Sequence, residues 1–189
     1  MSKKTLFATA LIVTGMALSM HASAEPYLGA GIGKSWWNLD CTGATYCKKS
    51  ATSYQVTGGY NFNPVWAMEG SFFSLGEISA NNASIAGTFK SSGVDLSAVA
   101  KTPAKKGFIG LAKMGLAYVK GEELRTVGSL FGSNSKYSVQ PVLGFGVIYQ
   151  VNDELDLRAE YTIRRTKVAN LENSTANVST VTVGAQSSF

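Results

Sequence analysis

The sequence has 189 residues, 20 glycines, four prolines and a formal net charge of +5 at pH 7. No stretch reaches the roughly 18 consecutive apolar residues of a transmembrane helix, which argues against a membrane protein built from helices. A net charge of this size is too small to indicate nucleic-acid binding by itself.

The N-terminal segment has the three-part pattern of a secretory signal peptide. Two lysines at positions 3–4 precede an apolar run at 6–20, and Ala-Ser-Ala at 22–24 provides a cleavage site of small residues. A transmembrane helix is the alternative, but the run is shorter than the roughly 20 residues that a helical span needs. We therefore expect residues 1–24 to be a cleaved signal peptide and residues 25–189 to form one domain.

Two cysteines, Cys41 and Cys47, lie close together in the stretch DCTGATYCKK. A secreted chain leaves the reducing cytoplasm, so we expect a disulfide that closes a short loop. A metal site is the alternative interpretation, but two thiolates without a histidine nearby make a poor one. We expect no metal and no other cofactor.

Eight segments alternate apolar residues with polar or small ones, which is the period of a β-strand. The stretch ELDLRAEYTIRR shows the pattern most clearly, with leucine, alanine, tyrosine and isoleucine on one face and mostly charged residues on the other. Most segments are near the roughly 9–11 residues of a tilted membrane strand. In chain order they are Pro26–Trp37, Thr52–Phe62, Val65–Gly76, Val94–Lys101, Phe108–Lys120, Tyr137–Gln150, Glu154–Arg165 and Asn177–Phe189.

The connections between these segments alternate between short and long. The short ones are Asn63–Pro64, Thr102–Lys106 and Val151–Glu154, and the long polar ones are Asn38–Ala51, Glu77–Gly93, Gly121–Lys136 and Lys167–Ala176. Short periplasmic turns and long outer loops are typical of outer-membrane barrels, and an even strand number closes without a free edge. We therefore predict an all-β fold, an eight-stranded antiparallel up-and-down transmembrane β-barrel.

Aromatic residues gather near the segment ends, as the two interfaces of a membrane favour. At the short-turn end we expect Tyr27, Phe62, Trp66, Phe108, Tyr149 and Phe189, and toward the long loops Trp36, Trp37, Tyr118, Tyr137 and Tyr161. A secreted soluble barrel of the lipocalin kind is the alternative fold. It would expose Leu, Val and Tyr to water on every strand, an apolar band far above the few hundred Å² that soluble monomers tolerate.

Several of these strands also resemble a known family. QPVLGFGVIYQVNDELDLRAEYTIRRT is similar to the sixth and seventh strands of the OmpA-type transmembrane barrel, including the Arg-x-Glu-Tyr pattern at Arg158, Glu160 and Tyr161. WAMEGSFFSLG resembles the family's third strand, with Glu69 at its inward glutamate position. LAKMGLAYVKG resembles the fifth strand, with Lys113 where the family carries an inward arginine.

The resemblance covers nearly all of residues 25–189 and implies a place in the outer membrane of a Gram-negative cell. Outer-membrane lipids, lipopolysaccharide and the barrel-assembly machinery are then the implied partners, and Phe189 matches the terminal residue by which such barrels are recognised for assembly. We expect no counterpart of the family's peptidoglycan-binding domain, which would be the stand-alone architecture of the small Ail/Lom and opacity-type barrels. Ile148 also replaces an inward glutamate of the family.

Six charged residues fall on the face that a membrane barrel turns inward. Eight strands enclose a lumen that side chains just fill, so these charges must be paired and hydrogen-bonded. A structural salt-bridge plug is one interpretation, and a narrow, gated ion path is the other. We expect Arg158 to bond Glu69, with Glu160 or Asp95 as further partners. The six residues are Glu69, Asp95, Lys113, Arg158, Glu160 and Arg164.

The sequence argues against an enzyme, because its one histidine, His21, lies inside the expected signal peptide. No imidazole is then left to act as a general base near neutral pH.

Basic residues outnumber acidic ones toward the long loops, where they would meet the phosphates of lipopolysaccharide. Charges that are simply solvated are the alternative. We expect an envelope structural or surface-interaction role without enzymatic activity. A low-conductance channel and a host-surface adhesin are the alternatives. The candidate lipopolysaccharide-facing residues are Lys48, Lys49, Lys90, Arg125, Lys136, Arg165 and Lys167.

Overall fold

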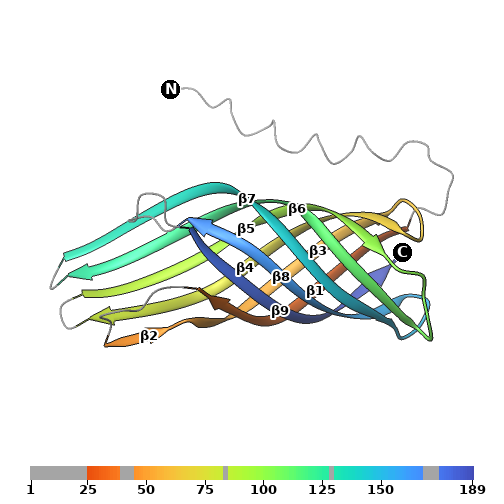
Figure 1. Cartoon of the computed structure of the whole chain (residues 1–189), viewed down its shortest axis with the longest axis horizontal. Coiled ribbons are helices and arrows are strands. Elements are labelled where there is room, and N and C mark those ends of the chain that lie inside the picture. The colour runs from red at the N-terminus through yellow and green to blue at the C-terminus, as the bar shows by residue number, and fades with distance from the viewer. Residues whose placement is uncertain (1–24, 39–44, 83–84, 128–129, 168–174) are drawn as a thin grey trace, which may run out of the picture.

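The computed structural model describes residues 25–38, 45–82, 85–127, 130–167 and 175–189 (Figure 1). Within these ranges the chain forms nine strands: β1 (Glu25–Trp37), β2 (Tyr46–Lys48), β3 (Ser50–Asn61), β4 (Trp66–Asn82), β5 (Ile85–Lys101), β6 (Phe108–Val127), β7 (Leu130–Gln150), β8 (Leu155–Lys167) and β9 (Thr175–Ser188). No helix in the described ranges has the length and apolar character to cross a membrane. The predicted signal peptide, residues 1–24, lies outside these ranges.

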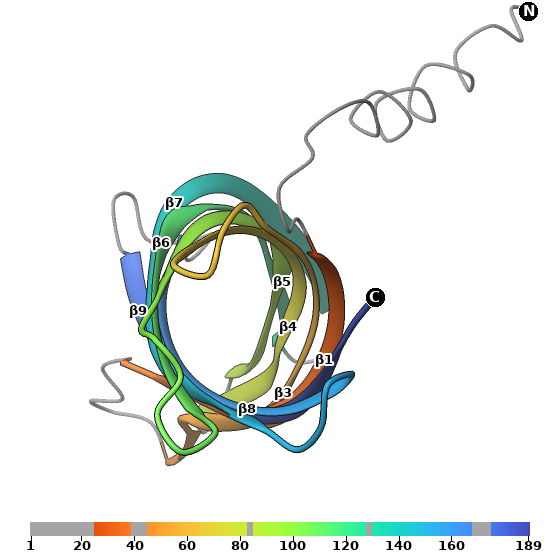
Figure 2. The same ribbon diagram turned by 90° about the vertical axis from the view of Figure 1, so that its right-hand side faces the viewer.

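All strands except β2 join into one closed antiparallel barrel. Each pairs with the next along the chain, and β1 pairs with β9 from Tyr27↔Ser188 to Trp37↔Val178, which closes the ring. Figure 2, a view along the barrel from the end that carries the C-terminus, shows the closed ring of strands. The predicted eight-stranded barrel is therefore confirmed, and closure leaves no free edge around its circumference.

The barrel strands separate apolar outer faces from polar inner faces, as the alternation predicts. On β8, Leu157 is 50% exposed on the outer face, whereas Glu160 is 3% exposed on the inner face. Large apolar side chains such as Leu96, Met114 and Phe145 are exposed on the outside of the other strands. This arrangement is that of a transmembrane barrel, because apolar side chains meet lipid and polar ones face the lumen.

Three short turns join the strands at the C-terminal end of the barrel. In two of them an asparagine orders the turn, since the side-chain oxygens of Asn63 and Asn152 each accept two backbone N–H bonds from residues two and three positions on. In the third, Lys106 and Gly107 both have positive φ, at 54° and 81°. Two such residues form the tight hairpin that matches the twist of the flanking strands.

At the opposite end, two of the predicted loops are largely strand. The pairing of β4 with β5 continues to Asn82↔Ile85, and that of β6 with β7 continues to Val127↔Leu130. Residues 77–82 and 85–93, and residues 121–127 and 130–136, are thus arms of two long hairpins that protrude beyond the other strands (left in Figure 1). They lack the apolar alternation of membrane strands, and the backbone ladder together with contacts such as the Glu77–Lys90 ion pair holds them extended.

The protruding sheet gains a further strand from the segment after β1. β2 pairs with the outer part of β4, with Tyr46 opposite Asn81. The register of β4 shifts between Ser74 and Glu77, where Gly76 has a φ of 76°. A bulge with glycine at positive φ bends a strand and increases its local twist, so β4 changes direction at the base of the protruding sheet.

Two apolar layers fill the ends of the lumen. Near the short turns the first layer consists of Tyr27, Ala67, Val99, Leu111 and Ile148. Toward the protruding sheet the second layer consists of Trp37, Ala51, Phe73, Leu75, Ile78, Ala117, Val119, Val142 and Val178. The largest group of charged side chains in the lumen lies between these two layers, and Arg164 is at the level of Val142 and Val178 of the second layer.

Candidate functional site

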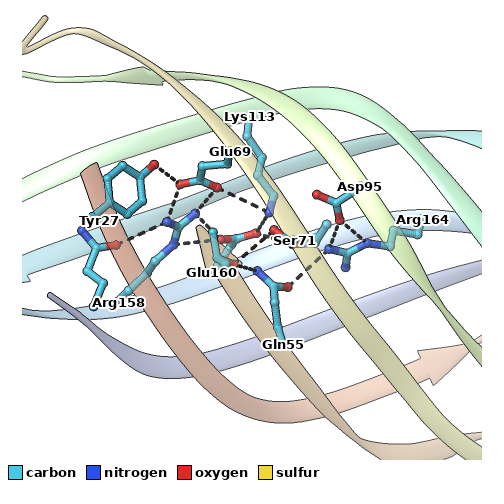
Figure 3. Close-up of polar contacts among 12 residues, drawn as sticks. Tyr27, Gln55, Glu69, Ser71, Asp95, Lys113, Arg158, Glu160 and Arg164 are labelled. Carbon is cyan, nitrogen blue, oxygen red and sulfur yellow. Dashed lines mark hydrogen bonds and ion pairs between the residues drawn. The ribbon is translucent and has the colours of Figure 1, made fainter. Parts of the chain in front are cut away.

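The charged residues predicted for the lumen fall into two neighbouring groups in its middle (Figure 3). The first, called the four-charge cluster, contains Glu69 from β4, Lys113 from β6, and Arg158 and Glu160 from β8. Strand alternation turns all four side chains inward. Arg158 has the most exposed of these side chains, at 10%. The cluster therefore lies almost entirely out of contact with bulk solvent.

Arg158 joins the two carboxylates of the cluster. Its Nη1 and Nη2 atoms donate to the two oxygens of Glu69 at 2.5 and 2.9 Å. Its Nε and Nη2 atoms also donate to one oxygen of Glu160, at 2.9 and 2.6 Å. A planar guanidinium suits this arrangement because it offers five donors in a fixed geometry.

Lys113 completes the charge balance of the cluster. Its ammonium lies 2.5 Å from Glu160 Oε1 and 3.9 Å from Glu69 Oε2. Two cations thus face two carboxylates, and the cluster has no net formal charge. Buried ions of this kind are tolerated only when each has a partner of opposite charge, which holds for all four.

Neutral side chains supply further bonds to the cluster. Tyr27 donates its hydroxyl to Glu69 Oε1 at 2.6 Å, and Thr162 donates to Glu160 Oε1 at 2.7 Å. The Tyr27 ring fits because position 59 is glycine, where an added Cβ atom would overlap with Tyr27 Cζ. Gly59 therefore provides the space that lets Tyr27 reach the carboxylate.

The second group is the Asp95–Arg164 pair, closer to the outer apolar layer. Arg164 donates from Nη2 and Nε to one oxygen of Asp95, at 2.7 and 3.2 Å. Its guanidinium carbon lies 4.3 Å from the centre of the Phe73 ring, which favours a cation–π contact. Asp95 thus pairs with Arg164, and the alternative contact of Asp95 with Arg158 is not made.

Sequence reasoning missed two inward aromatic residues. Tyr27 and Trp37 were expected in the interfacial girdles, but both are buried in the lumen. The alternation of β1 carried the signal for their inward position. Tyr27 and Trp37 are at odd positions, like the inward Gly29, Gly31 and Gly33, whereas Trp36 is at an even position and lies on the outer face. The other expected girdle residues lie outward or, in the case of Tyr161, half-buried.

The predicted outer basic residues do not form one cluster. Lys90 makes a 2.8 Å ion pair with Glu77, and this hydrogen bond raises the pKa of the Lys90 ammonium. Lys48, the last residue of β2, and Lys49 are exposed. Lys136 and Arg165 are exposed and have no ion pair within the described ranges. Arg125 and Lys167 belong to β6 and β8, but their side chains lie outside what the structure describes.

Two further predictions concern single residues of the chain. Cys47 lies on β2, whereas Cys41 falls outside the described residues, so the disulfide stays a prediction. Phe189 donates its backbone N–H to Pro26 at 3.1 Å and has an exposed side chain. An exposed terminal side chain is open to a partner, but its role in assembly stays a prediction.

The family model described as OmpA-like transmembrane domain matches residues 21–189. Among curated proteins, Outer membrane protein A of Escherichia coli O157:H7 is 26% identical over 166 residues, which cover 84% of this chain and 46% of that protein. Its counterpart in Klebsiella aerogenes is 25% identical over 168 residues. The chain spans about half the length of the curated relatives it matches.

Solved structures with the same fold share less of the sequence. Ail, the attachment invasion locus protein of Yersinia pestis, is 20% identical, with a TM-score of 0.61 over 88% of this chain and 99% of that one. A second Ail structure, with a TM-score of 0.58, is a complex with the heparin analogue sucrose octasulfate. Neisserial surface protein A is 18% identical, with a TM-score of 0.62 over 89% of this chain and all of that one. Identities this low show a shared fold and nothing more.

Proposed function

The chain belongs to the OmpA-like transmembrane domain family, and on this premise we propose that it is a closed outer-membrane barrel whose role lies at the cell surface. The barrel anchors the protruding sheet, and the lumen serves as a structural plug. Residues 1–24 direct secretion and are removed, and Phe189 is recognised by the assembly machinery. The chain has an envelope structural or surface-interaction role and no enzymatic one.

The observation that carries this proposal is the filling of the lumen along its length. From the short turns outward, a solute would meet an apolar layer, the four-charge cluster, the Asp95–Arg164 pair and a second apolar layer. An apolar layer opposes the passage of an ion, because a charge moved among apolar side chains loses its hydration. The charged groups between the layers are paired with one another, and of the two Asp95 oxygens one bonds Arg164 while Oδ1 is buried without a hydrogen-bond partner among the described residues.

The paired charges have a structural role in this proposal. They fill the centre of the barrel and link β4, β5, β6 and β8 through hydrogen bonds that are specific in direction. A mispaired register would leave one of these charges buried without a partner, at a large cost. The network therefore favours the observed register over its neighbours.

The outer surface is the proposed site of interaction. Short turns face the periplasm in this class of barrel, so the protruding sheet projects outward from the cell. Lys48, Lys49, Lys136 and Arg165 are exposed toward that end, where lipopolysaccharide phosphates are the nearest anions. The complex of Ail with a heparin analogue, a polyanion, shows that a relative of this fold holds an anionic ligand. We propose correspondingly that the exposed basic residues of this chain contact lipopolysaccharide or an external partner.

Single-channel recording in planar bilayers tests the closed lumen. We expect no conductance from the purified protein, and none from Arg158→Lys, which keeps the charge balance. The double variant Phe73→Ala with Leu75→Ala removes part of the outer apolar layer and is expected to leave the lumen closed. Adding Val99→Ala and Leu111→Ala opens the inner layer too, and only this quadruple variant is expected to conduct. Steady conductance from the unmodified protein would contradict the proposal.

A narrow gated channel is the second candidate, and two cavities favour it. One of about 30 Å³ lies in the lumen beside Arg158 and Glu160, which is room for water at a polar site. Another of about 320 Å³ opens at the short-turn end and is lined by Lys101, Asp156 and Ile148, among others. In this case Arg158→Ala alone would produce conductance, whereas the closed-lumen proposal expects the apolar layers to prevent it.

A further inference from the structure

A hollow of about 490 Å³ lies on the lipid face of the barrel, outside the lumen and away from the protruding sheet. Its floor consists of Ala98 and Ala100 on β5 and Ala112 on β6, whose side chains are short. Trp66 on β4 borders this floor next to Ala100, and Phe145 on β7 borders it next to Ala112. We call this hollow the lateral groove.

The lateral groove suits an apolar chain and not a polar ligand. Met114, Leu143 and Phe145 line it and are 63%, 53% and 61% exposed on the outer face. Lys113 also belongs to the lining, but it directs its ammonium to Glu160 inside the lumen. The volume is within the range of sites that hold a small molecule, and a lipid tail is the apolar chain that a membrane supplies.

The lateral groove rises from the short-turn end toward the middle of the membrane. It follows a ladder of paired residues from Trp66 through Ala100, Ala112 and Phe145 to Tyr161. Trp66 is the first residue of β4, whereas Tyr161 is in the middle of β8. The ladder climbs because the strands of such barrels are tilted by about 35–45°. A lipid tail takes the same course, from a headgroup at the interface to the midplane.

A basic turn lies below the floor of the lateral groove. It joins β5 to β6 and contains Lys105 and Lys106, which are exposed and make no ion pair within the described ranges. Lys105 pairs with Phe108, which is 52% exposed on the outer face. Directly paired residues lie on the same side of a sheet, so Lys105 is on the face of the groove. From Phe108 to Ala112 the strand covers about 13 Å, at about 3.3 Å per residue.

The other charges at the short-turn end lie elsewhere. The turn between β3 and β4, residues 62–65, has no charged residue. Lys101 and Asp156 bond to side chains at the mouth of the lumen, and Glu25 begins β1, which β3 and β4 separate from β5. Asp153 and Glu154 belong to the next turn, which joins β7 to β8, and no ion pair connects the two turns within the described residues. The turn below the groove is therefore the basic one.

We propose that the lateral groove holds one acyl chain of an anionic phospholipid of the periplasmic leaflet, whose headgroup phosphate contacts Lys105 and Lys106. The groove supplies van der Waals contacts to the chain, and the lysines attract the negative headgroup. Trp66 lies at the rim, where a tryptophan is favoured at the membrane interface. The short turns face the periplasm in this class of barrel, which favours a phospholipid over lipopolysaccharide. This inference goes beyond the proposed surface role and does not rest on it.

The test measures how brominated lipids quench the fluorescence of Trp66. The chain with Trp36→Phe and Trp37→Phe keeps Trp66 as its reporter. It is refolded into phosphatidylcholine vesicles that contain small fractions of brominated phosphatidylglycerol or of brominated phosphatidylcholine. Both leaflets of such vesicles have the same composition, so the orientation of the barrel does not affect the result. We expect half-maximal quenching at an about tenfold lower fraction of the brominated phosphatidylglycerol.

A second reporter at the same end of the barrel is the matched control. Leu28 on β1 is 55% exposed on the outer face and does not line the lateral groove. Leu28→Trp, in a chain whose native tryptophans are all replaced by phenylalanine, therefore reports on ordinary lipid contact. We expect the two brominated lipids to quench this reporter at equal fractions.

Two variants of outward alanines test the site of the acyl chain. Ala112→Leu fills the floor of the lateral groove and is expected to abolish the preference of Trp66 for brominated phosphatidylglycerol. Ala159→Leu adds the same side chain on β8, outside the groove, and is expected to keep that preference. Circular dichroism in the vesicles checks that each variant is folded.

Two double variants test the site of the headgroup. Lys105→Gln with Lys106→Asn removes the basic charges and is expected to abolish the preference. Asparagine is chosen because it tolerates the φ of 54° at position 106. Asp153→Asn with Glu154→Gln neutralises the acidic turn instead and is expected to leave the preference unchanged or to increase it.

Four outcomes would overturn the proposal. The two brominated lipids could quench Trp66 at equal fractions, which would indicate ordinary lipid contact. The preference could survive in Ala112→Leu, which would mean that the lysines attract headgroups without a site for a chain, or it could survive the loss of both lysines. Trp66 could be shielded from both lipids while the Leu28→Trp reporter is quenched, which would mean that a second copy of this chain covers the groove.

Discussion

Arg158 and Glu69 are 89 residues apart in the chain, yet they form two parallel hydrogen bonds of 2.5 and 2.9 Å across the lumen. A charge pair of this kind depends on both partners, because either one alone would be a buried and uncompensated ion. Breaking a buried pair by removing one partner costs about 3–5 kcal/mol.

Arg158→Ala should therefore lower the free energy of unfolding by about 3–5 kcal/mol. Glu69 and Glu160 would be left with Lys113 as the remaining cation of the cluster. Arg158→Lys is the matched control and should cost less, since it keeps the charge but loses the bidentate geometry. Refolding titrations in lipid vesicles measure both. An Arg158→Ala protein that unfolds at the unsubstituted midpoint would show that the pair adds no stability.

The double substitution Glu69→Gln with Arg158→Met should be milder than either single change. Removing both charges leaves Lys113 and Glu160, which are 2.5 Å apart and neutralise each other. The charge balance of the lumen is then restored, so the two effects should not add. The same vesicle titrations provide the double-mutant cycle. Additive costs would indicate that Arg158 acts mainly through Glu160 rather than through Glu69.

Leu157, next to Arg158 in sequence, should be intolerant of charge for a different reason. Its side chain is on the lipid face opposite Tyr149, two residues from the start of β8, so an arginine there should cost less than the about 2–4 kcal/mol of the bilayer midplane and more than the about 0–1 kcal/mol of the interface. Leu157→Arg should thus destabilise the barrel, and Leu157→Val should be nearly neutral. Unfolding in vesicles, compared for these two variants, checks the assignment of the face. Equal stability of the two proteins would contradict a lipid contact at this position.

Gly59 and Tyr27 should be energetically coupled. A Cβ atom at position 59 would overlap with the Cζ atom and the hydroxyl oxygen of Tyr27, so Gly59→Ala must displace the ring. We expect a cost of about 1–3 kcal/mol, the range for overpacking, together with loss of the bond to Glu69. In a Tyr27→Ala background the same change should cost close to nothing. Unfolding titrations of the four proteins measure the coupling, and a cost that persists in that background would place the strain in the backbone of β3.

Cys41 and Cys47 should be joined by a disulfide that contributes little to the barrel. The loop they close is short, so the constraint on the unfolded chain is small. Thiol labelling of intact purified protein should detect no free thiol, and Cys41→Ser should refold with a nearly unchanged midpoint. Two reactive thiols would refute the bridge, and collapse of the barrel in Cys41→Ser would refute its local role.

The sequence alone determined the barrel and the direction of its faces. Strand alternation is a local property with a period of two, so Leu157 and Glu160 could be assigned to opposite faces from their positions within ELDLRAEYTIRR. The same parity placed Glu69, Lys113 and Arg164 on inward positions. The alternation also runs through β1 and gives Tyr27 and Trp37 inward parity, whereas the girdle rule considers only how near a residue is to a strand end and therefore misplaces both.

The tertiary structure decided which inward groups meet. Strand tilt and register fix the height of each residue in the barrel, so Asp95 lies at the level of Arg164 and not of Arg158. It also decided how far the strands extend, because the ladders of β4 with β5 and of β6 with β7 continue to Asn82↔Ile85 and Val127↔Leu130 through segments without the apolar alternation of membrane strands. The lateral groove follows from register as well, because only the pairing of β5 with β6 brings the alanines of its floor side by side.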